Sequence, residues 1–122
     1  MPEVYTPDSF VIMELDFDDI TPNNLKLYKI LAGWSGGYLN GSSWRINSGI
    51  EYTTFDGEKI SVYGASGSRY DVYMRRYALR AATAPTWAQI KEIYKDKAQL
   101  LSENEAFAYL GRIARKAENG QA

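Results

Sequence analysis

Apolar and polar residues alternate through the first part of the chain, whereas apolar residues recur every three or four positions near its C-terminus. The first period is typical of strands with one buried face, and the second is typical of amphipathic helices. The residues SFVIMELDF, Ser9 to Phe17, follow the first pattern and predict a half-buried strand. The residues DDITPNN that come next predict a turn.

The residues LKLYKILAGW, Leu25 to Trp34, are compatible with two structures. As a helix they would have Thr21 as the N-cap, Pro22 in the first turn and Gly33 at the end. As a strand they would carry mixed residues on both faces, so the local signals favour the helix.

The middle of the chain predicts a meander of short strands separated by glycine-rich turns. Trp44 and Ile46 alternate with Arg45, which predicts that Trp44 lies in the core. We therefore expect Trp44→Ala to destabilise the protein by about 3–5 kcal/mol. Asp56-Gly57 predicts a hairpin turn. The inward positions of the strands that follow are Ile60, Val62, Tyr70, Val72 and Met74.

The C-terminal third predicts two helices that meet in an αα-hairpin or a sharp corner. Thr86 precedes Gln89 and Ser102 precedes Glu105, so each helix is expected to begin with a capping box. Two apolar stripes should face the core: Trp87, Ile90, Tyr94, Ala98 and Leu101, then Ala106, Phe107, Leu110, Ile113 and Ala117.

The composition restricts the chemistry. The 122 residues are 45% hydrophobic, carry a net charge of −1 and include no cysteine or histidine. This length suits one domain with a hydrophobic core. Disulfides, thiolate or imidazole metal sites and Ser-His-Asp or Cys-His catalysis are excluded. The N-terminus lacks the pattern of a secretory signal, and no apolar run approaches the roughly 20 residues that span a bilayer. We expect a soluble cytoplasmic protein with no membrane contact.

Charges are segregated along the chain. Residues 1–25 contain no lysine or arginine, and their acidic cluster includes Asp16, Asp18 and Asp19. A D-x-D pair can bind magnesium, but short acidic runs at strand ends are usually solvated, so no metal site is predicted. Four arginines lie close together later in the chain: Arg69, Arg75, Arg76 and Arg80. We expect the acidic and basic segments to act as two poles that select a partner.

The basic segment is also rich in tyrosine. Strand alternation places Arg69, Tyr73 and Arg75 on an outward face, beside Tyr63 and Arg45 if neighbouring strands pair in order. Arginine and tyrosine are typical of protein interfaces and of single-stranded nucleic-acid sites. The slightly negative net charge favours a protein partner. A solvated face with ion pairs such as Arg69 with Asp71 is the simpler alternative.

Trp34 and Tyr38 border a glycine-rich loop. Trp34 either packs beneath the loop with its indole N–H bonded to a carbonyl, or stands exposed with Tyr38 as a binding site.

Three runs resemble small uncharacterised proteins of bacteriophages and prophages: AGWSGGYLNGSSWRINSGI, FDGEKISVYG and SGSRYDVY. The resemblance spans about Leu27 to Tyr77, and SWRINSGI is its most specific part. It implies a β-meander, favours a strand for residues 25–34 and suggests a phage setting, but no activity attaches to that group. The acidic N-terminal strand and the C-terminal helices are not part of the resemblance.

These observations predict one α+β domain, 1–122, with a twisted antiparallel meander of about five strands, open or curled toward a small barrel, packed with a C-terminal helix pair. Its parts are an acidic strand and turn (1–24), the meander (25–80) and two helices (84–118). We expect a non-enzymatic, phage-type accessory protein without cofactor or metal, in the cytoplasm of the bacterial host.

The predicted role is inhibition of a host or defence protein, as by an anti-CRISPR protein. Single-stranded nucleic-acid binding through the Arg–Tyr face, and a carboxylate or magnesium-dependent enzyme, are the alternatives. The oligomeric state stays open. The predicted partner-binding residues are Asp16, Asp18, Asp19, Trp34, Tyr38, Arg45, Tyr63, Arg69, Tyr73, Arg75 and Arg76.

Overall fold

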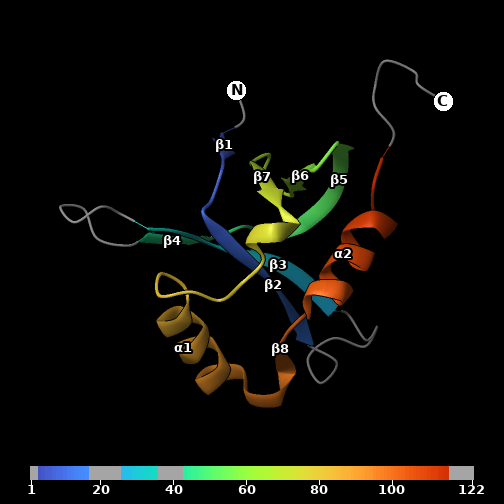
Figure 1. Ribbon diagram of the computed structural model, residues 1–122. Helices are drawn as coiled ribbons and strands as arrows, with labels where there is room; N and C mark the ends of the chain where they lie inside the picture. Colours follow the sequence, from blue (N-terminus) through green and yellow to red (C-terminus); the bar gives the residue numbers. More distant parts are fainter. Residues whose placement is uncertain (1–2, 17–25, 36–42, 116–122) are drawn as a thin grey trace.

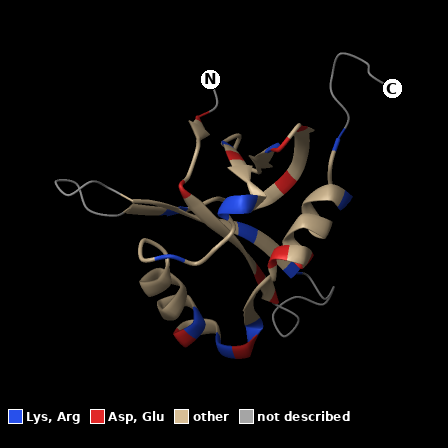
Figure 2. Cartoon of the chain, in the orientation of Figure 1, with Lys and Arg blue, Asp and Glu red and all other residues tan. Residues whose placement is uncertain are grey.

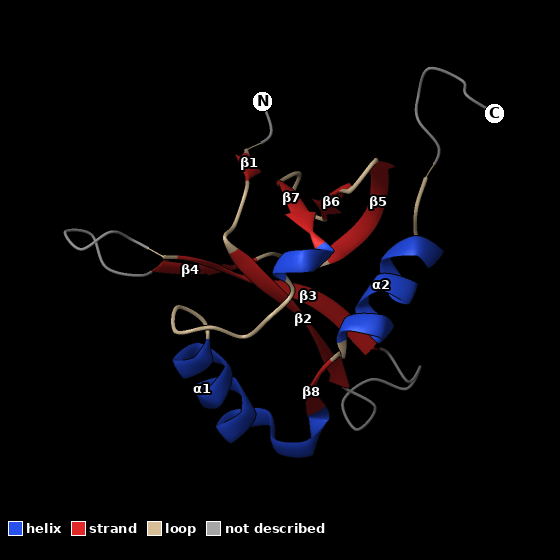
Figure 3. Ribbon diagram, in the orientation of Figure 1, coloured by secondary structure: helices blue, strands red, loops and turns tan. Residues whose placement is uncertain are grey.

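The computed structural model describes residues 3–16, 26–35 and 43–115, which form two four-stranded sheets and two α-helices (Figures 1 and 3). Sheet I has the order β1 (Val4–Tyr5), β7 (Arg69–Tyr73), β6 (Lys59–Gly64), β5 (Ile50–Asp56). Sheet II has the order β4 (Ser43–Ile46), β3 (Lys26–Trp34), β2 (Ser9–Asp16), β8 (Ala98–Leu100). The α+β class is confirmed. The strands are divided between two sheets, and among the described residues neither sheet closes into a barrel.

Sheet II is buried on both faces along its two central strands. β2 pairs with β3 in antiparallel register from Ser9↔Gly33 to Asp16↔Lys26. Phe10 and Ile12 belong to the cluster between the sheets, whereas Val11 and Met13 belong to a second cluster that Trp87 and Ile90 cover. The alternation that predicted a half-buried β2 is therefore incomplete, because its first five residues are all buried.

The ambiguous segment from Leu25 to Trp34 contains strand β3, so the helical alternative is wrong. Ile30, Leu31 and Ala32 are all inaccessible to solvent, because β3 lies between covered faces as β2 does. Apolar residues on both sides weaken the period of two, which is how a doubly buried strand differs from a half-buried one. Backbone pairing with β2 decides the structure against the local helix signals.

The chain crosses from sheet II to sheet I at Asn47, which is 5% exposed. Its side-chain oxygen accepts from the N–H of Ile30 at 2.9 Å, and its amide donates to the carbonyl of Gly49 at 3.3 Å. Gly49 has φ 142, and its carbonyl accepts from Ala65 N–H at 3.0 Å in the turn between β6 and β7. Two parts of the phage resemblance, NSGI at residues 47–50 and SGS at residues 66–68, thus lie in two turns that contact each other.

The two predicted C-terminal helices are present, but they do not follow one another directly. α1 (Ala84–Tyr94) ends at Lys95, which has φ 55, and the 3₁₀ turn η2 (Lys95–Lys97) leads into β8 rather than into more helix. Ala98 is fully buried and pairs with Leu15, so the edge of β2 receives a strand. The αα-hairpin prediction is therefore wrong.

Only one of the two predicted capping boxes forms. α1 begins before Thr86, with Thr83 at its N-cap. α2 (Glu103–Arg112) has the predicted box, since Ser102 and Glu105 exchange hydrogen bonds of 2.8 and 3.1 Å. α2 packs Ala106 and Leu110 on sheet I but leaves Phe107 54% exposed, contrary to the predicted stripe. Neither helix of the described chain has the length and apolar character needed to cross a bilayer.

Trp44 is not in the core; it is 50% exposed. It lies on the edge strand β4 opposite Gly33, which offers no side chain to pack on. The space above Gly33 is filled by the loop before α1, because a Cβ there would lie 2.8 Å from the Thr83 methyl carbon. Alternation assigned Trp44 the same face as Ile46, which packs on the second cluster, but the core ends before it reaches Trp44.

We accordingly expect Trp44→Ala to cost about 1 kcal/mol of unfolding free energy, as for a partly exposed residue. Phe10→Ala should cost about 3–5 kcal/mol, because Phe10 is 1% exposed in the main cluster. Urea unfolding of both variants tests this contrast. Equal losses in the two variants would contradict the exposed position of Trp44.

Tyr77 predicts an alkaline loss of stability. Its hydroxyl donates to Leu101 C=O at 2.6 Å and accepts from Ile12 N–H at 3.0 Å. Burial raises the pKa of Tyr77, and also that of Tyr109, to about 12 from 10.0. The folded state therefore holds these protons more tightly than the unfolded state does. This stabilisation is complete below pH 10 and is lost as the pH rises from 10 to 12.

The unfolding free energy of the parent chain, measured by urea at a series of pH values, should fall through this range. Tyr77→Phe and Tyr109→Phe should each have a shallower fall. A profile in either variant that runs parallel to that of the parent chain would contradict the assignment for that residue.

Candidate functional site

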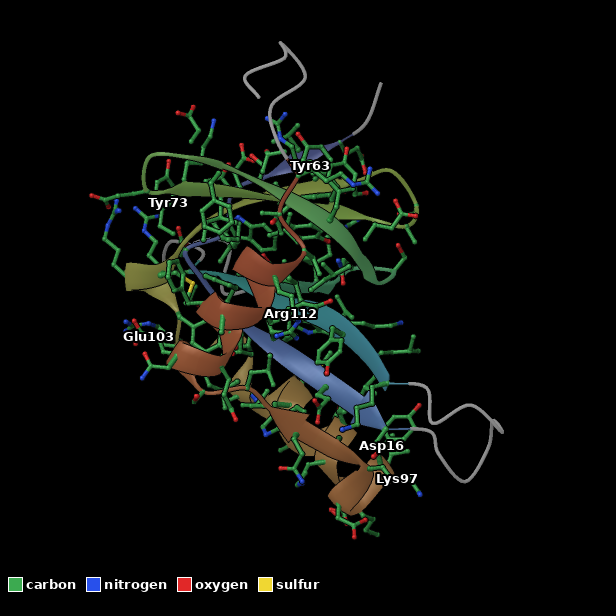
Figure 4. The ribbon with its side chains drawn as sticks, turned by 90° about the vertical axis from the view of Figure 1, so that its right-hand side faces the viewer. Asp16, Tyr63, Tyr73, Lys97, Glu103 and Arg112 are labelled. Atoms are coloured by element: carbon green, nitrogen blue, oxygen red, sulfur yellow. The ribbon has the colours of Figure 1, made fainter. Side chains whose placement is uncertain are left out.

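Sheet I has one face that packs in the core and one that does not. Its inward side chains are in the main cluster, among them Ile60, Val62, Tyr70 and Val72. The opposite side, here called the outer face, carries Tyr52, Thr54, Lys59, Ser61, Tyr63, Arg69, Asp71 and Tyr73. Neither α1 nor α2 lies over it in the described chain (Figure 4).

A row of stacked side chains crosses the outer face at one end. Tyr52 and Tyr63 are cross-strand partners, and their rings are parallel within 4° at a centroid distance of 4.4 Å. The Arg115 guanidinium lies 3.9 Å from the centre of the Tyr52 ring. Tyr63 in turn faces Arg69 on β7. Each ring is held by a neighbour, so this row is rigid before any partner binds.

A buried polar cluster forms the floor of the face. Ser61 and Asp71 are 6% and 7% exposed, and the Ser61 hydroxyl donates to the Asp71 carboxylate at 2.8 Å. The Arg69 guanidinium donates to both carboxylate oxygens, at 3.0 and 3.2 Å. Burial acts to lower the pKa of Arg69, but hydrogen bonds to Asp71 and Tyr63 outweigh it and the pKa is raised. Arg69 is therefore a fixed, paired cation.

A second row lies at the other end of the outer face, near the β5–β6 hairpin. The guanidinium groups of Arg75 and Arg76 lie 4.6 and 5.7 Å from the centre of the Tyr73 ring. Arg75 also pairs with Glu58 in the hairpin, at 2.8 Å. Both charged groups of this pair are exposed, so its main effect is to orient the arginine rather than to stabilise the fold.

An apolar groove adjoins the second row. It has a volume of about 280 Å³, and its lining residues include Phe55, Ile60, Met74 and Phe107 together with the charged residues Glu58 and Arg75. The Phe55 and Phe107 rings meet edge to face at 6.2 Å, although the two side chains are 39% and 54% exposed. Arg75 thus belongs both to the groove and to the second row.

Acidic residues accompany the arginines of this surface. Arg69 and Arg75 are paired with Asp71 and Glu58, and Asp56 lies beside Lys59. Figure 2 shows blue and red segments mixed along sheet I. The predicted basic pole is therefore not a field of unpaired positive charge.

The structure brings together five of the predicted partner-binding residues: Tyr63, Arg69, Tyr73, Arg75 and Arg76. Arg45 is not among them. β4 pairs with β3 instead of β5, so the Arg45 guanidinium lies 4.5 Å above Tyr5 on the other sheet. The condition that neighbouring strands pair in chain order fails at this point.

The remaining predicted residues are dispersed or undescribed. Trp34 contacts Tyr5 of the N-terminal segment, and its Nε1–H donates to Thr6 C=O at 3.1 Å. The bond to a carbonyl agrees with the simpler alternative, whereas the glycine loop predicted to cover Trp34 lies outside the described residues. Asp16 lies at the end of β2, far from Tyr63 and Tyr73 (Figure 4). Asp18, Asp19 and Tyr38 lie outside the described residues. Within the residues described, no group of three or more acidic side chains is placed to hold a metal.

Sequence reasoning missed Tyr52, Arg115 and the Phe55–Phe107 pair. The hairpin turn is formed by Gly57 and Glu58, with Asp56 opposite Lys59, and this register puts Tyr52 opposite Tyr63. A turn centred on Asp56-Gly57 would have put Tyr52 opposite Ser61. Arg115 reaches Tyr52 because the chain after α2 pairs with β5 at Thr53. No local pattern predicts that contact.

Comparison with known proteins adds no assignment: no protein-family model, curated protein or solved structure matches the chain. The resemblance to phage proteins therefore stays a prediction.

The stacked row predicts an energetic coupling between Tyr52 and Tyr63. In a double-mutant cycle to alanine, the coupling should be about 0.5–1.5 kcal/mol in unfolding free energy. Tyr63 with Tyr94, which lies on α1 away from sheet I, is the matched control pair and should be additive within about 0.5 kcal/mol. Additive losses for Tyr52 and Tyr63 would mean that the stack contributes nothing to the folded state.

Proposed function

We propose that the chain is a non-enzymatic binding protein that contacts a partner protein through the outer face of sheet I and the adjoining apolar groove. The observation that carries this proposal is that Arg75 contacts both the outer face and the apolar groove. One side of this arginine belongs to an ordered tyrosine–arginine face, and the other borders a groove with two exposed phenylalanines. Aromatic and arginine side chains around an apolar anchor site are typical of the hot spots of protein interfaces.

The arrangement of the rings favours protein over single-stranded nucleic acid. Bases would need free aromatic faces, but Tyr52 and Tyr63 stack on each other, and Arg115 covers Tyr52. Tyr73 has arginines over it. Phosphates would need unpaired cations, but Arg69 and Arg75 are paired with carboxylates. The surface therefore offers edges, hydroxyls and matched charges, which suit the mixed chemistry of a protein partner.

The same contacts reduce the cost of binding. Long side chains lose conformational freedom when an interface forms, at about 0.5–1.5 kcal/mol each. Arg69, Arg75 and Arg115 are already restrained by a carboxylate or a ring. A partner that inserts an apolar side chain into the groove lined by Phe55 and Phe107 would therefore meet polar side chains that are already in place.

The resemblance to phage proteins makes a host or defence protein the class of partner to screen first, with inhibition as the expected effect. This part of the proposal rests on the sequence runs described above.

The test is capture of a partner from bacterial lysate, followed by surface plasmon resonance with the purified partner. Phe107→Ala and Arg75→Glu should each weaken the complex by about thirtyfold or more, the usual effect of losing a hot-spot residue. Both side chains are exposed, so the melting temperature should change little. Ile93→Ala is the matched control, because Ile93 is 69% exposed on α1 and should not affect binding.

A partner that binds both variants as tightly as the parent chain would place the interface elsewhere. Saturable binding of a labelled single-stranded oligonucleotide at low salt, lost in Arg75→Glu, would favour the nucleic-acid alternative over the protein one.

A further inference from the structure

The edge of sheet II at β4 is open in the described chain. β4 is the last strand of its sheet, and its first three residues are exposed. Sheet edges carry unpaired backbone groups that pair readily with another strand. The other end of this sheet, at β8, is only three residues long. β4 is thus the place where sheet II can be extended.

The hydrogen-bond pattern shows which groups face outward. Asn47 N–H donates to Ile30 C=O at 3.2 Å, and the Asn47 side-chain oxygen accepts a hydrogen bond from Ile30 N–H at 2.9 Å. Hydrogen-bonded and non-bonded pairs alternate in an antiparallel ladder, so Ala32↔Arg45 is the next bonded pair. The N–H and C=O of Arg45 therefore face β3. Those of the residues on either side, Trp44 and Ile46, face the open edge.

The side chains of β4 give this edge a chemical character. Trp44 and Ile46 lie on one face, where Ile46 joins the cluster beneath α1 and Trp44 extends the apolar surface outward. Arg45 lies on the other face, over Tyr5. Within the part of the chain that is described, Arg45 forms no ion pair.

A second copy of the chain fits this edge poorly. In an antiparallel β4–β4 pair that uses the outward backbone groups of both Trp44 and Ile46, Trp44 of one copy lies opposite Ile46 of the other. Arg45 of one copy then lies directly opposite Arg45 of the next, at a non-hydrogen-bonded position where side chains are closest. Like charges at such a position destabilise a pair, whereas opposite charges stabilise it.

We propose that the β4 edge binds an extended segment of a partner protein as an added antiparallel strand, with an acidic residue opposite Arg45 and apolar residues opposite Trp44 and Ile46. Backbone hydrogen bonds provide the affinity, and the alternating side chains provide the specificity for the partner sequence. This site is separate from the outer face of sheet I, so it goes beyond the function proposed above and stands or falls independently of it.

The first test is amide hydrogen exchange of the free chain, followed by NMR. The amides of Trp44 and Ile46 should exchange at least about tenfold faster than the amide of Arg45, which is bonded to β3. Equal protection of all three amides would mean that the edge is already covered. Light scattering on the same sample shows whether a second copy covers it, and a β4-dependent dimer would overturn the proposal.

The second test uses two short capped peptides with the centres Val-Glu-Val and Val-Lys-Val, titrated into labelled protein. The Glu peptide should shift the amides of Trp44 and Ile46 saturably and bind about three- to fivefold more tightly than the Lys peptide. Arg45→Glu should reverse this preference. Arg76→Glu, a charge reversal in the 3₁₀ turn after β7, is the matched control and should leave this preference unchanged.

Trp44→Pro removes an outward N–H but no bond to β3, so it should abolish binding of the Glu peptide while α2 and sheet I keep their spectra. No saturable shift with either peptide at any soluble concentration would overturn the proposal. Equal binding of the two peptides, or a preference that Arg45→Glu does not reverse, would contradict the proposed acidic residue opposite Arg45.

Discussion

The structure depends on the enclosure of β2, which is covered on both faces and hydrogen-bonded along both edges. β3 pairs with its whole length on one edge. On the other edge β8 pairs with only three of its residues, from Met13 to Leu15. Further backbone groups on this edge of β2 have individual hydrogen-bond partners. Ala78 N–H donates to Phe10 C=O, Leu101 N–H donates to Ile12 C=O, and the Tyr77 hydroxyl accepts a hydrogen bond from Ile12 N–H. A strand this apolar is stable only when every backbone group inside has a partner.

This enclosure decides which surfaces remain free. Sheet I and α2 cover one side of β2 and α1 covers the other, so the inner face of sheet I is used in the core and its outer face is not. The chain that leaves α2 pairs with β5 at Thr53, and it carries Arg115 onto Tyr52. β4 extends beyond the covered part of sheet II, which leaves Trp44 at an open edge. Both proposed contact surfaces are therefore consequences of how the core is closed.

The phage-like runs acquire a structural explanation in this arrangement. Asn47 replaces a backbone partner of Ile30 at the point where the chain leaves sheet II, and the Ser48 hydroxyl accepts from Ser66 N–H at 2.9 Å in the facing turn. Gly64 lies so close to this turn that a Cβ would be 3.3 Å from the Gly49 carbonyl. These residues join the two sheets and do not form part of either proposed contact surface. The same runs also contain residues of both proposed contact surfaces, namely Trp44, Arg45 and Ile46 of the β4 edge and Tyr63, Arg69 and Tyr73 of the outer face.

The sequence by itself determined the features that depend on near neighbours: the α+β class, the β5–β6 hairpin, the Ser102 capping box and the faces of β6 and β7. Period and turn chemistry are local, so they can be found in one chain. The outward arginines and tyrosines of β6 and β7 were predictable for the same reason. Tertiary structure decided the strand at Lys26–Trp34, the conversion of Ala98–Leu100 from helix to strand, the separation of Arg45 from Tyr63 and the exposure of Trp44. Each of these depends on which strands become neighbours and where the core ends, and both are set by contacts between residues far apart in the chain, which no local pattern contains.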